Sequence, residues 1–228
     1  MVKIVCQLVS FRWLRVSLRA NVTQVSTPNT ARGTYAKTAG KRREILDAAF
    51  AVFSEKGYES GSVREIAERA GMTHTAVLFH FKTKVELLAA VLEVRDEISR
   101  ERFAAPSDSP LAQVLAYIDL LRDNLTDPGM IEMYSVLSAE ATSSAHPAHE
   151  YFERRYDWII AQAREALTEM QEAGTLRDGI SADYAARTLI ALADGLQLQF
   201  LYNRTGVDMV DTLRTFVQSI ITVTLDDA

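Results

Sequence analysis

Residues 62–86 read SVREIAERAGMTHTAVLFHFKTKVE, and this stretch decides the fold of the N-terminal part of the chain. Ser62 and Glu65 have the spacing of a capping box, which predicts a helix of about two turns that ends at Gly71. Glycine suits a tight turn there because it adopts positive φ without steric cost. A second short helix is predicted over Thr73–Phe81, with the threonine as its N-cap. Two short helices joined by such a turn form a helix-turn-helix, whose second helix enters the major groove of DNA.

The segments on either side of this stretch also have helical patterns. Upstream, an apolar stripe that includes Ile45 and Phe53 ends at Lys56–Gly57, a composition typical of a helix C-terminus. Downstream, residues 83–86 (TKVE) form a second capping box, which predicts a longer helix. Four helices therefore fit between Lys41 and Phe103.

The rest of the chain continues with helical periodicity and has no alternating strand pattern. Ser109–Pro110 and Asp127–Pro128 each have the order of an N-cap followed by a proline in the first helical position. The helix that follows these two is predicted to end at Gly174, and the last two helices of the chain are predicted to cover about 181–203 and 208–225. The predicted fold is all-α with about nine helices, divided into a flexible basic extension (1–40), a helix-turn-helix DNA-binding domain (41–88) and a helical ligand-binding and dimerisation domain (89–228).

The composition indicates a soluble globular protein with an uneven charge distribution. The 228 residues are 48% hydrophobic with a formal charge of −5, which excludes a disordered or collagen-like chain. The single cysteine, Cys6, excludes an intrachain disulfide framework. The sequence contains no uncharged apolar run long enough to predict a membrane span. Residues 1–43 carry nine Lys or Arg and no acid, whereas residues 89–228 sum to −12. This asymmetry favours a polyanion-binding or targeting role for the N-terminus.

Residues 1–40 are interpreted separately from the fold. Residues 1–19 are acid-free, contain arginine and are partly amphipathic, which fits an organellar transit peptide; an upstream extension from a misplaced start codon fits equally well. Residues 21–40 are rich in Ser, Thr, Gly and Asn, so we expect a flexible arm. The nine cations of residues 1–43 are a hypothetical source of extra phosphate contacts.

The quoted stretch resembles the signature of the TetR/AcrR family of bacterial helix-turn-helix transcriptional regulators. The resemblance is sharp over the first four helices, where His80–Phe81 and Lys84 fall at the family's positions, and looser beyond them, where it includes Asp194–Gly195–Leu196. It implies a homodimer whose recognition helices read two half-sites of a pseudo-palindromic, double-stranded DNA operator. It also implies a small-molecule effector that displaces the long helix beginning at Lys84 and thereby relieves repression.

The residues of the predicted DNA interface have distinct chemical roles. Thr73 and Lys84 suit phosphate oxygens, while Arg64 is the preferred residue for reading a base. The predicted DNA-binding residues are Lys41, Arg42, Arg43, Ser62, Arg64, Thr73, His74, Thr75, Leu78, Phe79, His80 and Lys84.

Some of these residues also have simpler interpretations. His80 equally suits a packing role, whereas for Arg64 and Lys41–Arg43 the DNA contact is preferred over the alternative of an ordinary solvated surface. The sequence departs from the family at Leu78, where a tyrosine that contacts a phosphate is usual, and at Ala76, where a small hydroxyl residue is common. Ile66, Val77 and Phe81 are expected in the core.

The acidic remainder is expected to bind an effector and a second subunit. The predicted effector-binding residues are aromatic, soft or acidic side chains, namely Tyr117, Leu121, Met133, Tyr134, Leu137, Glu140 and Trp158. Glu140 needs a cation, either Arg154 or Arg155 or a charged group of the ligand. The predicted dimer residues are Leu189, Leu192, Leu196, Phe200, Leu213, Val217 and Ile220, for which burial within one subunit is the alternative.

Other functions fit the sequence less well. The segment His146–Glu150 places two histidines near a carboxylate, but it matches no zincin order, and no phosphate loop or activated nucleophile is recognisable. We therefore expect no enzyme activity, no metal and no cofactor, and a location in the bacterial cytoplasm. A transcriptional activator of the same fold, or a helical interaction module without specific DNA binding, remains the alternative.

Overall fold

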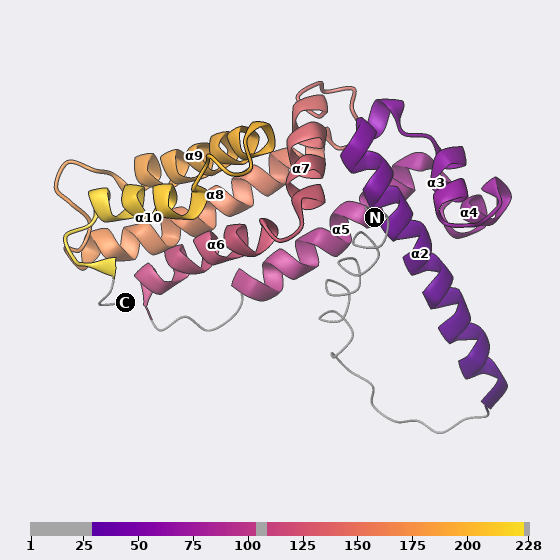
Figure 1. Cartoon of the computed structure of the whole chain (residues 1–228). Helices are drawn as coiled ribbons and strands as arrows, with labels where there is room; N and C mark the ends of the chain where they lie inside the picture. Colours follow the sequence, from indigo (N-terminus) through magenta and orange to yellow (C-terminus); the bar gives the residue numbers. More distant parts are fainter. Residues whose placement is uncertain (1–28, 104–108, 226–228) are drawn as a thin grey trace. The chain divides into compact units, whose positions relative to one another are not determined.

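The computed structural model describes residues 29–103 and 109–225, and within them it contains nine α-helices and no extended strand (Figure 1). The chain divides into two compact units, with the boundary between Ile98 and Ser99. An all-α architecture is therefore confirmed. The first unit holds α2 (Asn29–Ser60), α3 (Val63–Arg69), α4 (His74–His80) and most of α5 (Lys84–Phe103). The second holds α6 (Pro110–Asn124), α7 (Pro128–Glu140), α8 (His149–Glu172), α9 (Ala182–Tyr202) and α10 (Met209–Ile220).

Helix α2 begins at Asn29, upstream of the predicted start at Lys41. The expectation of a flexible arm was therefore wrong for residues 29–40, while residues 1–28 lie outside the described residues. Three alanines in this segment favour a helix, and extending an existing helix costs far less than nucleating one. At the other end, Gly57 has φ 71°, so the regular helix breaks where the glycine predicted it, before one more turn to Ser60.

Local side-chain chemistry sets the ends of the short helices as predicted. The Ser62 hydroxyl accepts the Glu65 backbone N–H at 3.1 Å, and the Thr73 hydroxyl accepts that of Ala76 at 3.1 Å. Gly71 between them has φ 64°, the left-handed conformation that the tight turn requires. The second half of the first capping box does not form, because the Glu65 carboxylate pairs with Lys56 and Arg69.

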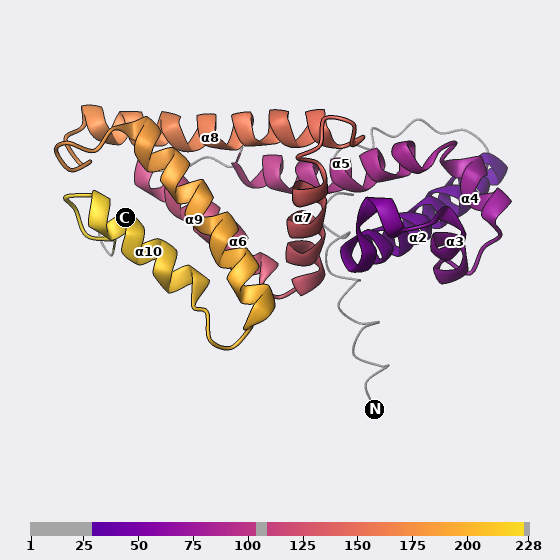
Figure 2. The ribbon, with the colours of Figure 1, turned by 90° about the horizontal axis from the view of Figure 1, so that it is seen from above.

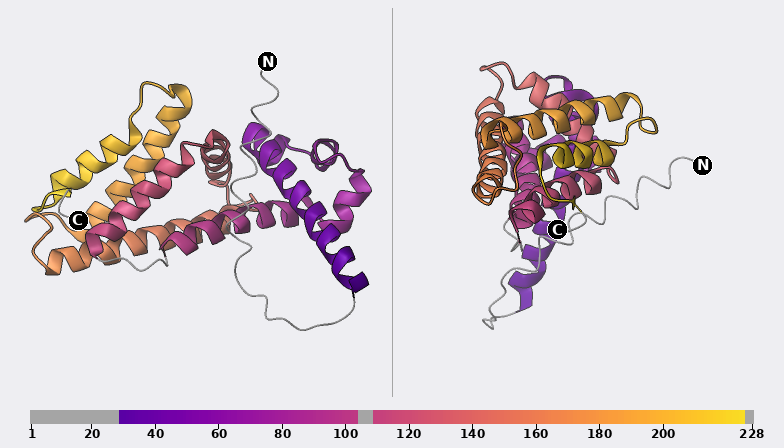
Figure 3. Two further views of the ribbon diagram at one scale, coloured as in Figure 1. Left: turned by 60° about the horizontal axis from the view of Figure 1, so that its bottom comes forward. Right: turned by 90° about the vertical axis from the view of Figure 1, so that its left-hand side faces the viewer.

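A small core holds the first unit together. Helices α2 and α3 pack on each other, and α4 packs on α3 (Figure 3). The core side chains are at most 2% exposed; they include Ile45, Phe53, Ile66, Val77, Phe81, Leu87 and Leu88. Ile66, Val77 and Phe81 are thus core residues, as predicted. Because Val77 and Phe81 come from α4 and its C-cap, they fix which face of α4 turns inward.

The second unit is a bundle in which α8 and α9 form the largest contact. Helix α6 packs on α8, and α10 packs on both α9 and α6, whereas α7 crosses at a steep angle to α8 (Figure 2). Both predicted proline starts are confirmed: α6 begins at Pro110 after an N-cap at Ser109, and α7 begins at Pro128. The described helices include none with the length and apolarity that a bilayer crossing needs.

The residues predicted for the dimer surface lie instead in the core of this bundle. Six of them are no more than 7% exposed in the single chain, namely Leu189, Leu196, Phe200, Leu213, Val217 and Ile220, and Leu192 is half-buried against the same core. The prediction needs correction, because the apolar stripes of α9 and α10 are covered by α6 and α8 of the same subunit. Burial within one subunit, the alternative interpretation, therefore has direct support for the six buried residues, and Leu192 stays a prediction.

Arg69 joins the last turn of α3 to α2 through an ion-pair network. Its guanidinium donates to both carboxylate oxygens of Glu55, at 2.7 and 2.6 Å, and to Glu65 at 2.9 Å. Hydrogen bonding to Arg69 holds the pKa of Glu55 below its ordinary value of 4.5. The bidentate geometry fixes the position of α3, which in turn supports α4.

We predict that Arg69→Met lowers the free energy of unfolding by about 1 kcal/mol at pH 7, the upper end of the range for exposed pairs. Because the folded-state pKa of Glu55 is lowered, this stabilisation is complete above pH 4.5 and is lost as the pH falls through the lowered pKa. Urea unfolding of both proteins at pH 7 and pH 3.5 measures the difference, which must shrink at the lower pH. Arg154→Met, which removes a single exposed pair with Glu150, is the control. Equal stability of wild type and Arg69→Met at pH 7 would contradict the prediction.

Candidate nucleic-acid interface

Helix α4 turns one face inward and the other to solvent. Val77 is fully buried on the inner face, whereas Thr73, His74, Thr75 and Phe79 are exposed. The turn before α4 is closed by two backbone hydrogen bonds, Gly71 N–H to the Glu68 carbonyl at 3.1 Å and Met72 N–H to the Ala67 carbonyl at 2.9 Å. The outer face is therefore presented by a rigid turn, as the second helix of a helix-turn-helix is presented to a major groove.

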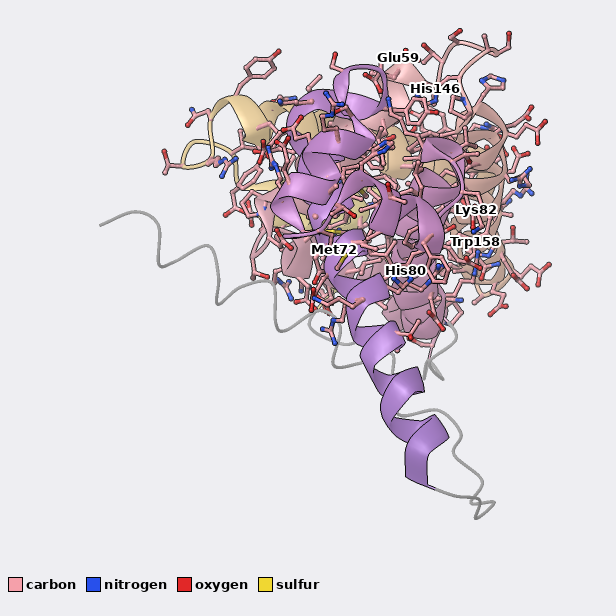
Figure 4. All side chains as sticks on the ribbon, turned by 90° about the vertical axis from the view of Figure 1, so that its right-hand side faces the viewer. Glu59, Met72, His80, Lys82, His146 and Trp158 are labelled. Atoms are coloured by element: carbon pink, nitrogen blue, oxygen red, sulfur yellow. The ribbon has the colours of Figure 1, made fainter. Side chains whose placement is uncertain are left out.

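Arg42 fixes the C-terminal end of α4. Its guanidinium lies 4.2 Å from the Phe81 ring centroid and donates to the His80 carbonyl at 3.4 Å. The side chains of Met72, His80 and Lys82 mark the two ends of this helix in Figure 4. His80 is half-buried and meets the Phe79 ring edge to face at 5.5 Å. The packing interpretation of His80 therefore has direct support, and Arg42 has a structural role whether or not it also meets a phosphate.

Lys84 connects the start of α5 to the end of α2. Its ammonium lies 4.2 Å from the Tyr58 ring centroid and donates to the Glu59 carbonyl at 3.4 Å. Lys41 pairs with Glu44 at 2.6 Å. These contacts hold two of the predicted phosphate-binding cations at defined positions on the surface.

Arg64 is exposed at the second residue of α3, and it makes no hydrogen bond or ion pair with any side chain in the described part of the chain. A guanidinium without a protein partner keeps all its donors for a ligand, which suits the predicted contact with a guanine.

Lys82 was not predicted as a DNA-binding residue. It is exposed just after α4, lies 5.4 Å from the Phe79 ring centroid and donates to the Phe79 carbonyl at 3.2 Å. Its position directly after the His80–Phe81 pair could have indicated it.

The predicted effector residues do not form one site. Leu121, Met133 and Leu137 are buried in the bundle, and Trp158 packs against its core. Tyr134 shares a hydrogen bond of 2.8 Å with the Tyr151 hydroxyl, and the Arg155 guanidinium lies 4.6 Å from its ring centroid.

Glu140 lies near a residue that was not predicted as its partner. Its carboxylate lies 3.7 Å from His146 Nε2, while Arg154 pairs with Glu150 at 3.4 Å. The Glu140 side chain is 24% exposed, so it is not the fully buried carboxylate expected from the apolar stripe. The loop after α7 returns His146 to this carboxylate, which helical spacing alone could not indicate.

Tyr117 lies in a narrow, mostly apolar crevice between α6, α8 and α9. The other lining residues are Gln113, Val114, Ile159, Gln162, Ala163, Ala166, Leu189 and Ile190. None of them carries a charge, and the side-chain amides of Gln113 and Gln162 make no hydrogen bond to the described residues. The two glutamines had no sequence pattern to distinguish them from ordinary half-buried helix residues.

The histidines of residues 146–150 have structural partners. His146 Nδ1 accepts the Ala148 N–H at 3.1 Å, and His149 Nδ1 lies 2.8 Å from the Ala141 carbonyl. No group of three side chains suited to hold a metal exists within the described ranges. Both rings therefore shape the loop between α7 and α8.

Near the middle of α9, Asp194 accepts a hydrogen bond of 2.9 Å from the Tyr156 hydroxyl of α8. Burial and the charge of Asp194 both raise the pKa of Tyr156, so the phenol remains a donor. This bond links the two longest helices of the second unit.

Comparisons with known proteins agree with this arrangement. Residues 45–91 match the family described as bacterial regulatory proteins, tetR family, and residues 111–222 match the C-terminal region of BetI-type transcriptional repressors. The HTH-type transcriptional regulator PksA of Bacillus subtilis is 26% identical over 188 residues, which cover 82% of this chain and 91% of PksA.

Solved structures of regulators have the same fold. The triclosan complex of SmeT, the Stenotrophomonas maltophilia repressor of a multidrug efflux pump, has a TM-score of 0.67 and 24% identity, covering 80% of this chain and 92% of SmeT. A transcriptional regulator from Saccharomonospora viridis in complex with choline has a TM-score of 0.64 and 23% identity, with 81% and 100% covered. With its capped helix-turn-helix and its helical second unit, the chain belongs to the TetR family of bacterial helix-turn-helix transcriptional regulators.

Proposed function

We propose that this chain is a repressor that binds a pseudo-palindromic operator as a homodimer and is released from it by a small molecule. The observation that carries the proposal is the exposed outer face of α4, which is capped at Thr73 and held from within by Val77 and Phe81. The role is regulatory rather than catalytic, and it is exercised on DNA in the bacterial cytoplasm. Arg64, His74 and Thr75 supply base contacts, and Thr73, Lys82 and Lys84 supply phosphate contacts.

A stripe along the outside of α9 is the proposed surface for the second copy. Its residues are spaced alternately by four and three, namely Tyr184, Thr188, Ala191, Gly195, Leu198 and Tyr202, and all but Thr188 are exposed. A Cβ atom added to Gly195 would meet no atom within 4 Å other than those of its chain neighbours and the adjacent backbone of α9 itself. Glycine weakens a helix interior, yet the fold of one subunit does not require it here. A helix of the second copy that packs closely against α9 would explain the glycine at this position. The alternating spacing of four and three residues is that of a helix–helix seam.

The crevice around Tyr117 is the proposed effector site. Its apolar walls suit an apolar molecule, and the amides of Gln113 and Gln162 can orient a hydroxyl or carbonyl group. No acidic residue lines it, so a cation would lose its hydration without a countercharge. A neutral effector, closer in chemistry to triclosan than to choline, is therefore favoured. Because α5 starts at Lys84 and continues past the boundary between the units, it is the element through which the effector acts on the DNA-binding unit.

The operator proposal predicts a saturable complex with DNA from upstream of the chain's own gene in a mobility-shift titration. The affinity must fall as salt concentration rises, because lysine and arginine displace counterions from phosphates. A scrambled fragment of equal length is the control. If no salt-sensitive complex forms, or if the scrambled fragment binds equally well, the chain is not an operator-binding regulator of that gene.

Arg64→Ala is expected to reduce operator affinity by about 1–3 kcal/mol, or roughly 5- to 150-fold, since a bidentate contact with a guanine is lost. Fluorescence anisotropy with labelled operator measures the loss. Arg154→Ala removes an exposed arginine from α8 and should leave affinity unchanged. A loss of the same size for operator and scrambled DNA would instead assign Arg64 to a phosphate.

The effector site predicts that triclosan raises the melting temperature of the full chain by mass action, whereas choline at equal concentration does not. Ala163→Trp fills the crevice and should abolish the shift, and Arg154→Ala is again the matched control. Differential scanning fluorimetry makes the measurement. Stabilisation by choline alone, or an undiminished triclosan shift in Ala163→Trp, would place the effector elsewhere.

A further inference from the structure

Phe79 leaves an aromatic ring in solvent on the outer face of the recognition helix α4. The residue is 72% exposed, whereas its neighbours in the α4 segment, Val77 and Phe81, are fully buried. The fold of the first unit therefore gains little from this ring. An apolar side chain that folding does not use is available for a contact with a partner.

The ring is held in place by two neighbours. The Lys82 ammonium lies 5.4 Å from the ring centroid and is anchored by its hydrogen bond to the Phe79 carbonyl. The His80 ring meets it edge to face, with an interplanar angle of 87°. Phe79 is thus an oriented apolar surface with a cation beside it.

The chemistry of α4 narrows what this face can recognise. The helix reads HTAVLFH and contains no Arg, Lys, Asn, Gln, Asp or Glu, so it lacks the usual bidentate readers of guanine and adenine. Thr75 and Phe79 are both exposed and lie one turn apart on the same face, which adds a methyl group to the phenyl ring. In the major groove the apolar feature that distinguishes one base from the others is the C5-methyl group of thymine.

We propose that Phe79 is a specificity-determining residue that packs on the C5-methyl group of a thymine in each half-site, while Lys82 neutralises a neighbouring phosphate. This inference rests on the proposed operator binding. Because the Lys82 ammonium lies beside the Phe79 ring, it can pair with the adjacent DNA phosphate while the ring itself faces the base edge. A contact with deoxyribose, which carries no sequence information, is the competing outcome.

The test uses the full-length chain and an operator selected by it from a random-sequence DNA library. Fluorescence anisotropy compares this operator with versions in which one symmetric pair of thymines is replaced by deoxyuridine, which removes only the methyl groups. Loss of one buried methyl corresponds to about fourfold in affinity, and loss in both half-sites to about fifteenfold. We expect one pair of positions to show this loss.

Three variants separate the ring from other effects. Phe79→Ala should bind the thymine operator more weakly and show no further loss with deoxyuridine at that pair. Phe79→Tyr keeps the ring and should retain the penalty. Val85→Ala removes the other exposed large apolar side chain of the described first unit, outside α4, and should behave like wild type. Circular dichroism confirms that each variant is folded.

The outcomes distinguish this inference from the proposal beneath it. The thymine contact is supported if wild type loses affinity on the deoxyuridine operator and Phe79→Ala does not. A loss in Phe79→Ala that is the same for thymine and deoxyuridine operators overturns it in favour of a backbone contact. Saturable binding with no methyl-sensitive pair also overturns it and leaves operator binding intact. If the library yields no bound sequence, operator binding itself fails and this inference fails with it.

Discussion

The burial of Val77 and Phe81 is the constraint on which the DNA-binding unit depends. Helix α4 has only seven residues, and a helix of that length is unstable alone because nucleation is costly. Two fully buried side chains on one face, a threonine cap at one end and Arg42 on the C-terminal carbonyl supply what the helix lacks. Since the inner face is fixed in this way, the outer residues occur at defined positions and can be chosen for contact rather than for folding.

The cations around α4 divide into two groups. Arg42 and Lys84 each combine an aromatic contact with a hydrogen bond to a carbonyl at a helix end, so they hold α4 and α5 in place. Arg64 and Lys82 are exposed and do not join two helices: Arg64 makes no hydrogen bond or ion pair within the described residues, and the Lys82 ammonium contacts only Phe79, three residues before it. Both are therefore more available to a ligand. Because residues 41–88 sum to only +1, nonspecific attraction to phosphates is weak in one subunit. The helix-turn-helix segment must then contribute affinity through placed contacts, to which the proposed pairing of two subunits on one DNA would add.

Helix starts were predictable from the sequence because capping is local chemistry. Ser62, Thr73 and Ser109 accept the N–H groups that their spacing predicted. The start of α2 was missed, since helix propagation into residues 29–40 depends on the helix that follows and not on a local cap. In the first unit, buried and exposed residues of α4 followed the helical period, so Val77 and the outer positions were assigned correctly.

The sites of the second unit were less predictable because apolar periodicity reports burial but not the identity of the neighbour. Leu189, Leu213 and Val217 have the pattern expected of a dimer surface, yet α6 and α8 of the same chain cover them. Of the predicted effector residues, only Tyr117 lines the proposed crevice. Gln113 and Gln162 were not predicted, because they come from different helices and no spacing along the chain brings them together. Their proximity is a property of the tertiary packing.

Helix α9 connects the two proposed sites of the second unit. Leu189 and Ile190 face the crevice, and Thr188 and Ala191, their immediate neighbours in sequence, lie on the outer stripe proposed for the second copy. A helix moves as a rigid element, so an effector that enlarges the crevice also moves the stripe. The effector can shift the subunit arrangement only by the difference in its affinity for the two states. If the crevice is the effector site, its narrowness would supply such a difference, because a bulky molecule would favour an arrangement in which α9 is displaced.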